Sequence, residues 1–330
     1  APHSCTSYDE VVMDNLVAYS LVAVYSAMGV YTVAFILFTL DLAKRSAQRA
    51  EPVAARAQQA AVNSSSMTSV LERPVAPLQS GGATRYERAG LALSILGFVL
   101  HAAAVLTRGF AAERVPWTNM FEFGLTATVV MMGTFVAVQL WKDLRYLGAY
   151  ITGFVVLSLG IVTVNFYVDV VPTPPALQSA WLVIHVLVAA LATAFFAIGA
   201  GLSIMQLMQA RREARESAGL RFLDTLPGAS VLESLAYRVT VVGFVFWTFT
   251  LIAGAIWAER AWGRYWGWDT KEGWTFIIWT LFAGYIHARA TRGWRGNRSA
   301  WLAIVGFGAV LFNYSIVNLY FNGLHSYSGL

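Results

Sequence analysis

The sequence predicts an all-α integral membrane protein, a bundle of about eight transmembrane helices with both termini on the outer face. Of the 330 residues, 57% are hydrophobic and only 12% are charged, and the mean hydropathy is +0.57. Several apolar runs also reach the length of about 20 residues that a helix needs to cross a bilayer. Long alternation of polar and apolar residues is absent, which favours helices over a membrane barrel.

The expected spans follow one another along the whole chain. In order they cover residues 16–40, 89–106, 121–140, 147–164, 182–208, 239–257, 274–290 and 299–320. The first is too long, and followed by too many others, to be a signal peptide. The chain therefore divides into an outer tail with the first helix (1–40), a connecting segment (41–88) and a seven-helix core (89–330).

Two connecting segments have distinctive compositions. Residues 41–88 are rich in Ala, Gln, Ser and Pro and have few large apolar side chains, which predicts a mostly disordered cytoplasmic linker with a short helix near 54–61. Residues 209–222, QARREARESAGLRF, are basic and predict a cytoplasmic helix extension along anionic lipid headgroups.

The distribution of cations predicts the orientation. The connections after the first, third, fifth and seventh spans hold 18 of the 23 Lys and Arg residues. Cytoplasmic loops carry the excess of such residues, so this side is expected to be cytoplasmic. Both termini, and the loop between the sixth and seventh spans, are then expected to face outward.

That outer loop, residues 257–274 (WAERAWGRYWGWDTKEGW), has an unusual composition. It holds five tryptophans, three cations (Arg260, Arg264 and Lys271) and three carboxylates. An interfacial aromatic belt is the simplest interpretation. Five indoles are more than one anchor needs, however, and Trp262 and Trp266 are one helical turn apart, so they are expected to share a face suited to a flat apolar ligand. The cations suggest an anionic ligand, with salt bridges to the neighbouring carboxylates as the alternative.

Two outer segments have the spacing of a helix start. Asn119 and Glu122 have the spacing of an N-cap residue and its reciprocal acceptor, and Asp269 and Glu272 repeat it. Capping alone is therefore one interpretation of Asp269.

The histidines provide the candidate ligands. His185 and His325 are expected near the outer face, whereas His101 and His287 fall inside apolar spans, and His3 lies in the terminal tail. Ionisable groups in spans are functional candidates, although a single helical histidine is often structural. Two facing imidazoles on different helices are typical axial ligands of haem, whereas zinc would need a further ligand. Counting from helix ends places His287 deeper toward the cytoplasm than His101.

Four segments together resemble a known family. WGRYWGWDTKEGW is similar to the WWD motif of haem-handling membrane proteins, and PALQSAWLVIH, NLYFNGLHSYSGL and RVPWTNMFEF are similar to segments of the CcsA/ResC branch of system II cytochrome c biogenesis. They occur in the family's order, over the second to eighth spans. Thr270 departs from the family pattern, which usually has Pro after the Asp.

The resemblance implies the haem-handling subunit of a holocytochrome c synthase. Haem b, the transported substrate, would be held in the membrane by His101 and His287 and then by His185 and His325 at the outer face. Thioether bonds would form there with the C-x-x-C-H segment of apocytochrome c. The implied haem platform is Trp262, Trp266, Trp268, Asp269 and Trp274; Arg260, Arg264 and Lys271 are candidates for pairing with the propionates, and Ser326, Tyr327 and Asn322 for hydrogen bonds to the site histidines.

The implied partners are a ResB-like membrane subunit, apocytochrome c, a thioredoxin-like thiol reductant and membrane lipid, with no nucleic acid. One alternative is a haem transporter whose partner carries the attachment chemistry. Another is an electron-transferring b-type cytochrome subunit, but that class usually places two histidines on one helix. The single cysteine, Cys5, excludes an internal disulfide framework and a C-x-x-C-H motif in this chain. The Ala- and Arg-rich composition favours a bacterial plasma membrane over a thylakoid membrane.

Overall fold

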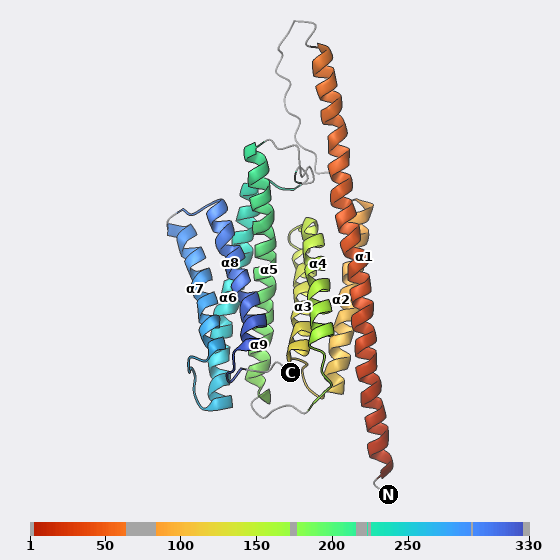
Figure 1. The fold of residues 1–330 in the computed structure, drawn as a ribbon, viewed down its shortest axis with the longest axis vertical. Coiled ribbons are helices and arrows are strands. Elements are labelled where there is room, and N and C mark those ends of the chain that lie inside the picture. The colour runs from red at the N-terminus through yellow and green to blue at the C-terminus, as the bar shows by residue number, and fades with distance from the viewer. Residues whose placement is uncertain are drawn as a thin grey trace.

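The computed structural model describes residues 3–63, 84–171, 177–215, 223, 226–291 and 293–325. Within these ranges the fold is all-α, without a β-strand (Figure 1). The elements in chain order are α1 (His3–Asn63), α2 (Arg85–Ala111), α3 (Met120–Val138), η1 (Arg145–Leu147), α4 (Gly148–Asn165), α5 (Ala180–Arg215), α6 (Ala229–Trp262), α7 (Thr270–Thr291), α8 (Asn297–Phe312), η4 (Asn313–Val317) and α9 (Asn318–Tyr320).

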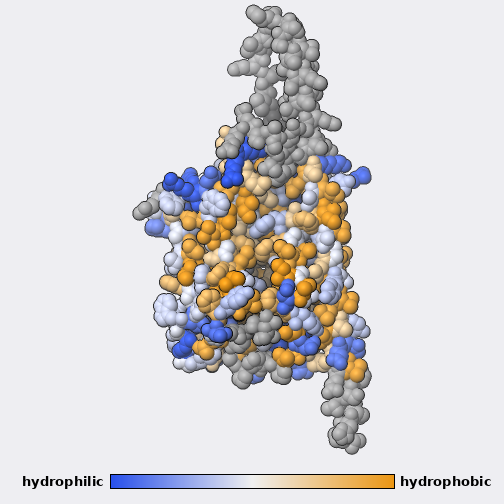
Figure 2. Space-filling view, in the orientation of Figure 1, coloured by the Kyte–Doolittle hydropathy of each residue, from blue (hydrophilic) through white to orange (hydrophobic). Residues whose placement is uncertain are grey.

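The chain is a multi-pass membrane protein. Seven of the described helices are long and apolar enough to cross a membrane. The eighth long helix, α7, has an acidic residue in its first turn and a basic one in its last, and it runs beside α6 and α8. On the face shown in Figure 2, hydrophobic residues form a broad band between two more hydrophilic ends. The predicted all-helical membrane bundle is thus confirmed.

The first part of the chain differs from the prediction. α1 does not stop near residue 40 but continues to Asn63, and α2 already begins at Arg85. The disordered linker predicted for 41–88 is therefore helical over 41–63 and 85–88, and 64–83 lie outside the described residues. Part of the basic extension predicted for 209–222 is confirmed as helix, because α5 continues to Arg215. The composition of residues 41–88 did not indicate the longer α1 and the earlier start of α2, because a helix can continue beyond the apolar part that the membrane requires.

The helices pack as two groups that meet through α5. The first group is formed by α1, α2, α3 and α4, and the second by α6, α7 and α8. α1 packs along α2 and α4, α5 packs along α6, and α5 also contacts α3 and α8. At the centre of the second group, the rings of Phe196 (α5) and Phe282 (α7) stack with their centroids 3.7 Å apart. The start of α1, the loop between α6 and α7 and the chain after α9 lie at one end of the bundle, the lower end in Figure 1.

A buried ionic cluster fixes the start of α3. Asn119 caps this helix as predicted, accepting a hydrogen bond from the Glu122 N–H at 2.9 Å. The fully buried Glu122 carboxylate binds Arg114 at 2.6 Å and Arg108 at 3.3 Å. Arg108 also donates to the Val168 carbonyl at 2.6 Å, which ties the segment after α4 to the same cluster.

Removing the carboxylate of this cluster is expected to destabilise the bundle. Glu122→Gln leaves the charges of Arg108 and Arg114 without their counter-charge, and breaking a buried pair in this way typically costs about 3–5 kcal/mol. The free energy of unfolding, measured by titrating the detergent-solubilised protein with SDS, should fall by that amount. Glu113→Gln, at an exposed acid of the same loop, should change it by less than about 0.5 kcal/mol. Equal values for the two variants would contradict this role.

Candidate functional site

The tryptophan-rich segment is partly helix and partly loop. α6 extends to Trp262 and ends at Gly263, whose φ of +69° is the left-handed conformation that favours glycine, and whose N–H donates to the Glu259 carbonyl at 2.8 Å. Trp262 therefore lies on the helix and Trp266 in the following loop. The prediction that these two indoles share a helical face is wrong, because the helix ends between them.

Glu272 holds this loop closed. Its carboxylate accepts hydrogen bonds from the N–H groups of Gly267 at 2.8 Å and Asp269 at 3.0 Å, and it pairs with Arg264 at 3.2 Å. The predicted capping contact from Glu272 to Asp269 is confirmed. For Arg264, the structure therefore shows the second of the two predicted roles of these cations, a salt bridge to a neighbouring carboxylate.

His185 and His325 are brought together around one buried tryptophan. His185 lies in the second turn of α5 and His325 follows α9, yet both rings contact Trp257, which is 2% exposed. The His185 ring stacks against this indole with a centroid distance of 5.9 Å, and the His325 ring meets it edge-on at 5.4 Å. Trp262 makes a second edge contact with His325 at 4.8 Å. The two outer histidines of the sequence prediction therefore belong to one site.

Hydrogen bonds orient both imidazoles in the same way. Nδ1 of His185 lies 3.0 Å from the Thr250 carbonyl oxygen, which can only accept, so this nitrogen donates. Nδ1 of His325 lies 2.7 Å from Oδ2 of Asp269, and the His325 backbone N–H donates to the same oxygen at 3.2 Å. In a neutral imidazole with a protonated Nδ1, the Nε2 lone pair is available to a metal.

Asp269 is thus more than a helix cap. The hydrogen bond from His325 lowers the pKa of Asp269 to about 2, below the ordinary value of an aspartate. Because the pKa of Asp269 is lower in the folded state, the stability that this hydrogen bond contributes is fully present above the ordinary pKa of an aspartate, near 4. That stability is lost as the pH falls toward 2. The carboxylate is therefore charged at neutral pH and anchors the segment that carries His325.

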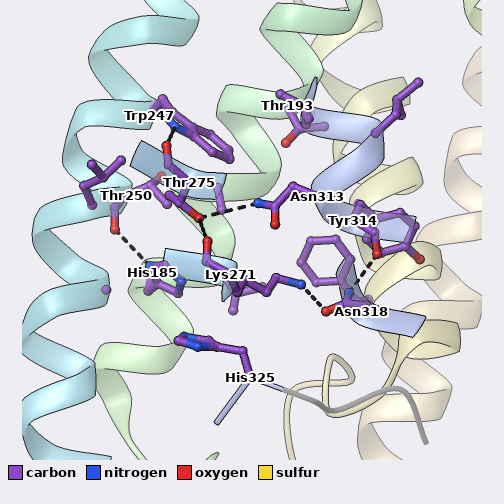
Figure 3. A pocket seen from close by; sticks show the side chains of 18 of the residues that line it. His185, Thr193, Trp247, Thr250, Lys271, Thr275, Asn313, Tyr314, Asn318 and His325 are labelled. Atoms are coloured by element: carbon purple, nitrogen blue, oxygen red, sulfur yellow. Dashed lines mark hydrogen bonds between the residues drawn. The ribbon is translucent and has the colours of Figure 1, made fainter. Parts of the chain in front are cut away.

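A cavity of about 210 Å³ opens beside the two histidines. Its walls come from α3, α4, α5, α6, α7, α8, the π-helical turn η4 and α9, and they are mostly apolar. Figure 3 shows His185, His325 and Lys271 on its border, with Trp247, Thr193 and Asn313 further along it. Trp266 also lines it. A pocket with apolar walls and a few polar groups is the usual form of a small-molecule site.

The other predicted platform and propionate residues lie in different surroundings. Trp268 is 71% exposed and has a positive φ of 57°, and Trp274 packs against Phe312 with a centroid distance of 4.4 Å. Neither is among the residues that line the cavity. Arg260 is exposed on the last turn of α6. Asn322 is exposed next to α9, and Ser326 and Tyr327 lie outside the described residues.

The structure does not bring His101 and His287 together. His101 is fully buried, with Nδ1 3.5 Å from the hydroxyl of Tyr31 on α1, whereas His287 is exposed on α7. α2 packs against α1 and α3, α7 packs against α6 and α8, and Figure 1 places α2 and α7 on opposite flanks. The pairing of these histidines on one haem is therefore corrected. The prediction rested on the position of both histidines inside apolar spans and on the family resemblance, and neither determines which helices are neighbours.

Several site residues were missed by the sequence interpretation. Thr250, Gly254 and Trp257 form the surface of α6 on which His185 rests, and Asn313 and Asn318 line the cavity from the end of the chain. A signal was present for α6, because positions 250, 254 and 257 are spaced as neighbours on one helical face. No comparable signal identified the asparagines.

Comparison with known proteins places these features in a family. Residues 90–325 match the family described as Cytochrome C assembly protein. The cytochrome c biogenesis protein CcsA of Guillardia theta is 33% identical over 258 residues, covering 73% of this chain and 86% of that protein. CcsA of Prochlorococcus marinus (strain MIT 9312) is 34% identical over 262 residues, covering 71% and 83%. The CcsA of Synechococcus sp. (strain CC9902) is 42% identical over 176 residues, which cover 47% of this chain and 58% of that one.

A solved structure shares the fold. The cytochrome c heme lyase CcmF aligns with a TM-score of 0.61 and 16% identity, covering 91% of this chain. This chain spans 46% of CcmF, and the likeness concerns the fold alone. The family match over residues 90–325 and the CcsA relatives that cover more than two thirds of the chain show the family directly. The chain belongs to the CcsA cytochrome c biogenesis proteins, a family of multi-pass membrane proteins that act in cytochrome c maturation.

Proposed function

We propose that this chain is the haem-handling subunit of a system II cytochrome c synthase, holding haem b, its transported substrate, between His185 and His325. The observation that carries the proposal is the shared arrangement of the two imidazoles. Both contact Trp257, both have Nδ1 engaged with an acceptor, and both border one apolar cavity. Two imidazoles with available Nε2 atoms suit the two axial positions of haem iron.

The surrounding residues fit a porphyrin better than a bare metal ion. The cavity walls are mostly apolar and include Trp266, which suits a flat hydrophobic ring. The described residues contain no group of three or more His, Cys, Asp or Glu side chains placed to hold a metal ion. The donor set therefore supports a macrocycle that supplies its own equatorial ligands.

We place this site on the extracytoplasmic face of a plasma membrane. In the topology expected from the sequence, the connections that hold most of the Lys and Arg residues lie on the opposite side of the membrane. Cytoplasmic loops carry such an excess of cations. The start of α1 and the chain after α9 lie at the same end of the bundle, and the cavity is lined by His325, which belongs to that chain after α9. The haem would thus be presented where a ResB-like subunit and apocytochrome c meet it.

The proposed role of the chain in the reaction is positioning. A cysteine thiol of C-x-x-C-H adds across a haem vinyl group: the sulfur–carbon bond forms, the carbon–carbon double bond becomes single, and the thiol proton ends on the other vinyl carbon. A thioredoxin-like reductant keeps both thiols reduced. Fixing the haem converts an encounter of two large molecules into a reaction between held groups, which can supply about 7 kcal/mol or more in favourable cases. The incoming histidine of C-x-x-C-H would replace one of the two protein imidazoles and release the product.

Cytochrome c maturation in cells tests this proposal. His185→Ala and His325→Ala should each abolish maturation when the chain is expressed with its partner and an apocytochrome, because each removes one iron ligand. Added imidazole should restore part of it by occupying the vacated position. His3→Ala, which removes a histidine of the first helical turn, should mature cytochrome c like the unaltered chain. Normal maturation by both outer variants would contradict the proposal.

A further inference from the structure

A polar cluster lies on the cavity wall next to the histidine pair. It consists of Lys271 from the first turn of α7, Asn313 from η4 and Asn318 from α9, and we call it the lysine–amide cluster (Figure 3). All three residues line the same cavity as His185 and His325. Asn313 lies in the π-helical turn, a distortion that is frequent at functional sites.

The ammonium group of Lys271 has an amide as its partner where a carboxylate would be expected. Its Nζ donates to Oδ1 of Asn318, which uses one of its three N–H donors. The acids nearest in sequence are engaged elsewhere, Asp269 with His325 and Glu272 with Arg264. Among the described residues, the ion pairs do not include Lys271. The Asp269 carboxylate attracts this cation but does not pair with it. A cation beside an apolar cavity is costly without a paired counter-charge, so an anionic group of the ligand would be stabilised there.

Asn313 provides a second unmet polar group at the same place. Its side chain is buried, with the residue only 5% exposed. Nδ2 lies 3.5 Å from Oγ1 of Thr275, and within the described part of the chain Oδ1 has no hydrogen-bond partner. Figure 3 shows this oxygen pointing into the cavity. Because the amide can flip and the Thr275 hydroxyl can rotate, Asn313 can present either its oxygen or its NH₂ group to a ligand.

The other two cations of this region are less suited to a ligand in the cavity. Arg264 is paired with Glu272, and Arg260 is exposed on α6 and does not line the cavity. We propose that Lys271, Asn313 and Asn318 bind a carboxyl group of the ligand that the two histidines hold. On the proposed function, on which this inference rests, that group is a haem propionate.

Such a contact would set the orientation of the porphyrin. Two axial imidazoles leave the ring free to rotate about the axis through the iron, whereas a second anchor at one edge removes that freedom. The propionates lie on one side of haem and the vinyl groups toward the other. Binding a propionate at the lysine–amide cluster therefore directs the vinyl groups away from the α7 and η4 wall. The site would select porphyrins with a free carboxyl group.

Titration with haem and with haem dimethyl ester tests this inference. The purified chain is titrated with each compound and binding is followed by absorbance, for the unaltered chain, Lys271→Met, Asn313→Asp and Arg260→Met. The unaltered chain should bind haem about 10- to 100-fold more tightly than the ester, as expected for charge-assisted hydrogen bonds. Lys271→Met should remove this preference while keeping the ester affinity, which also shows that the variant is folded. Arg260→Met should keep the preference.

Asn313→Asp supplies an independent arm, because its carboxylate would compete with the propionate for Lys271. It should weaken haem binding more than ester binding. The inference would be overturned if Lys271→Met lost equal affinity for haem and for the ester, or if it kept the preference for haem over the ester. His185→Ala separates the two levels of the account. If His185→Ala weakens the binding of both ligands while Lys271→Met changes the affinity for neither, only the carboxyl subsite fails. If His185→Ala changes the affinity for neither ligand, the proposed haem site fails as well.

Discussion

Gly254→Ala is expected to abolish cytochrome c maturation without unfolding the protein. Gly254 lies on α6 directly beneath the His185 ring, where an added Cβ would approach Cε1 of that ring to 2.7 Å and Nδ1 to 2.9 Å. Real Cβ atoms essentially never come so close, so the imidazole must move away. It would then lose its hydrogen bond to the Thr250 carbonyl and the position we propose for binding iron. Maturation assays and the haem content of the purified variant measure the effect.

A matched glycine substitution separates this effect from helix stability. Alanine favours a helix over glycine by about 1 kcal/mol, so the substitution itself supports α6. At Gly284 in α7 an added Cβ meets nothing within 4 Å, and Gly284→Ala should retain both maturation and haem. If Gly254→Ala also retained both, the observed position of His185 would have no bearing on function.

Asp269→Ala is expected to reduce haem affinity by about 10- to 100-fold, the usual cost of removing a group that orients a metal ligand. The carboxylate accepts hydrogen bonds from both the ring and the backbone of His325, and its loss releases the segment that follows α9. Asp269→Asn keeps one oxygen acceptor of similar size and should lose less. Haem titration of the detergent-purified variants gives the affinities.

Because Asp269 acts through His325, its loss should respond to added ligand. Free imidazole can occupy the position that a displaced His325 leaves, so it should restore haem binding in Asp269→Ala. Asp169→Ala, at an exposed acid of another loop, should bind haem like the unaltered chain. An affinity loss that imidazole cannot restore would show that Asp269 serves the fold of the loop, and would contradict the positioning role.

The spans and the outer site were predictable from the sequence to different degrees. Apolar runs identified the eight long helices that the structure describes, seven of which are long and apolar enough to cross a membrane, because the membrane imposes that length on a span. They did not give the ends of α1 and α6, where the helix continues into polar sequence, whereas the basic residues after the fifth span did predict the extension of α5. The extension of α6 matters most, since it carries Trp262 to His325.

Contacts between distant segments account for what the sequence left open. His185 and His325 could be assigned to one side of the membrane from topology alone. Their partners could not, since Thr250 is a backbone acceptor and Asp269 is 56 residues from His325 in the chain. The same limitation produced the wrong pairing of His101 with His287, whose helices lie on opposite flanks. Helix order along the chain does not specify which helices pack together.

The absorption spectrum of the purified, haem-loaded protein tests the central claim most directly. The unaltered chain should show the low-spin spectrum of iron with two imidazole ligands. His185→Ala and His325→Ala should each lose that spectrum, and added imidazole should bring it back in both. If both variants keep the spectrum of the unaltered chain without imidazole, neither residue is an axial ligand, and the cavity beside Trp257 is not the haem site.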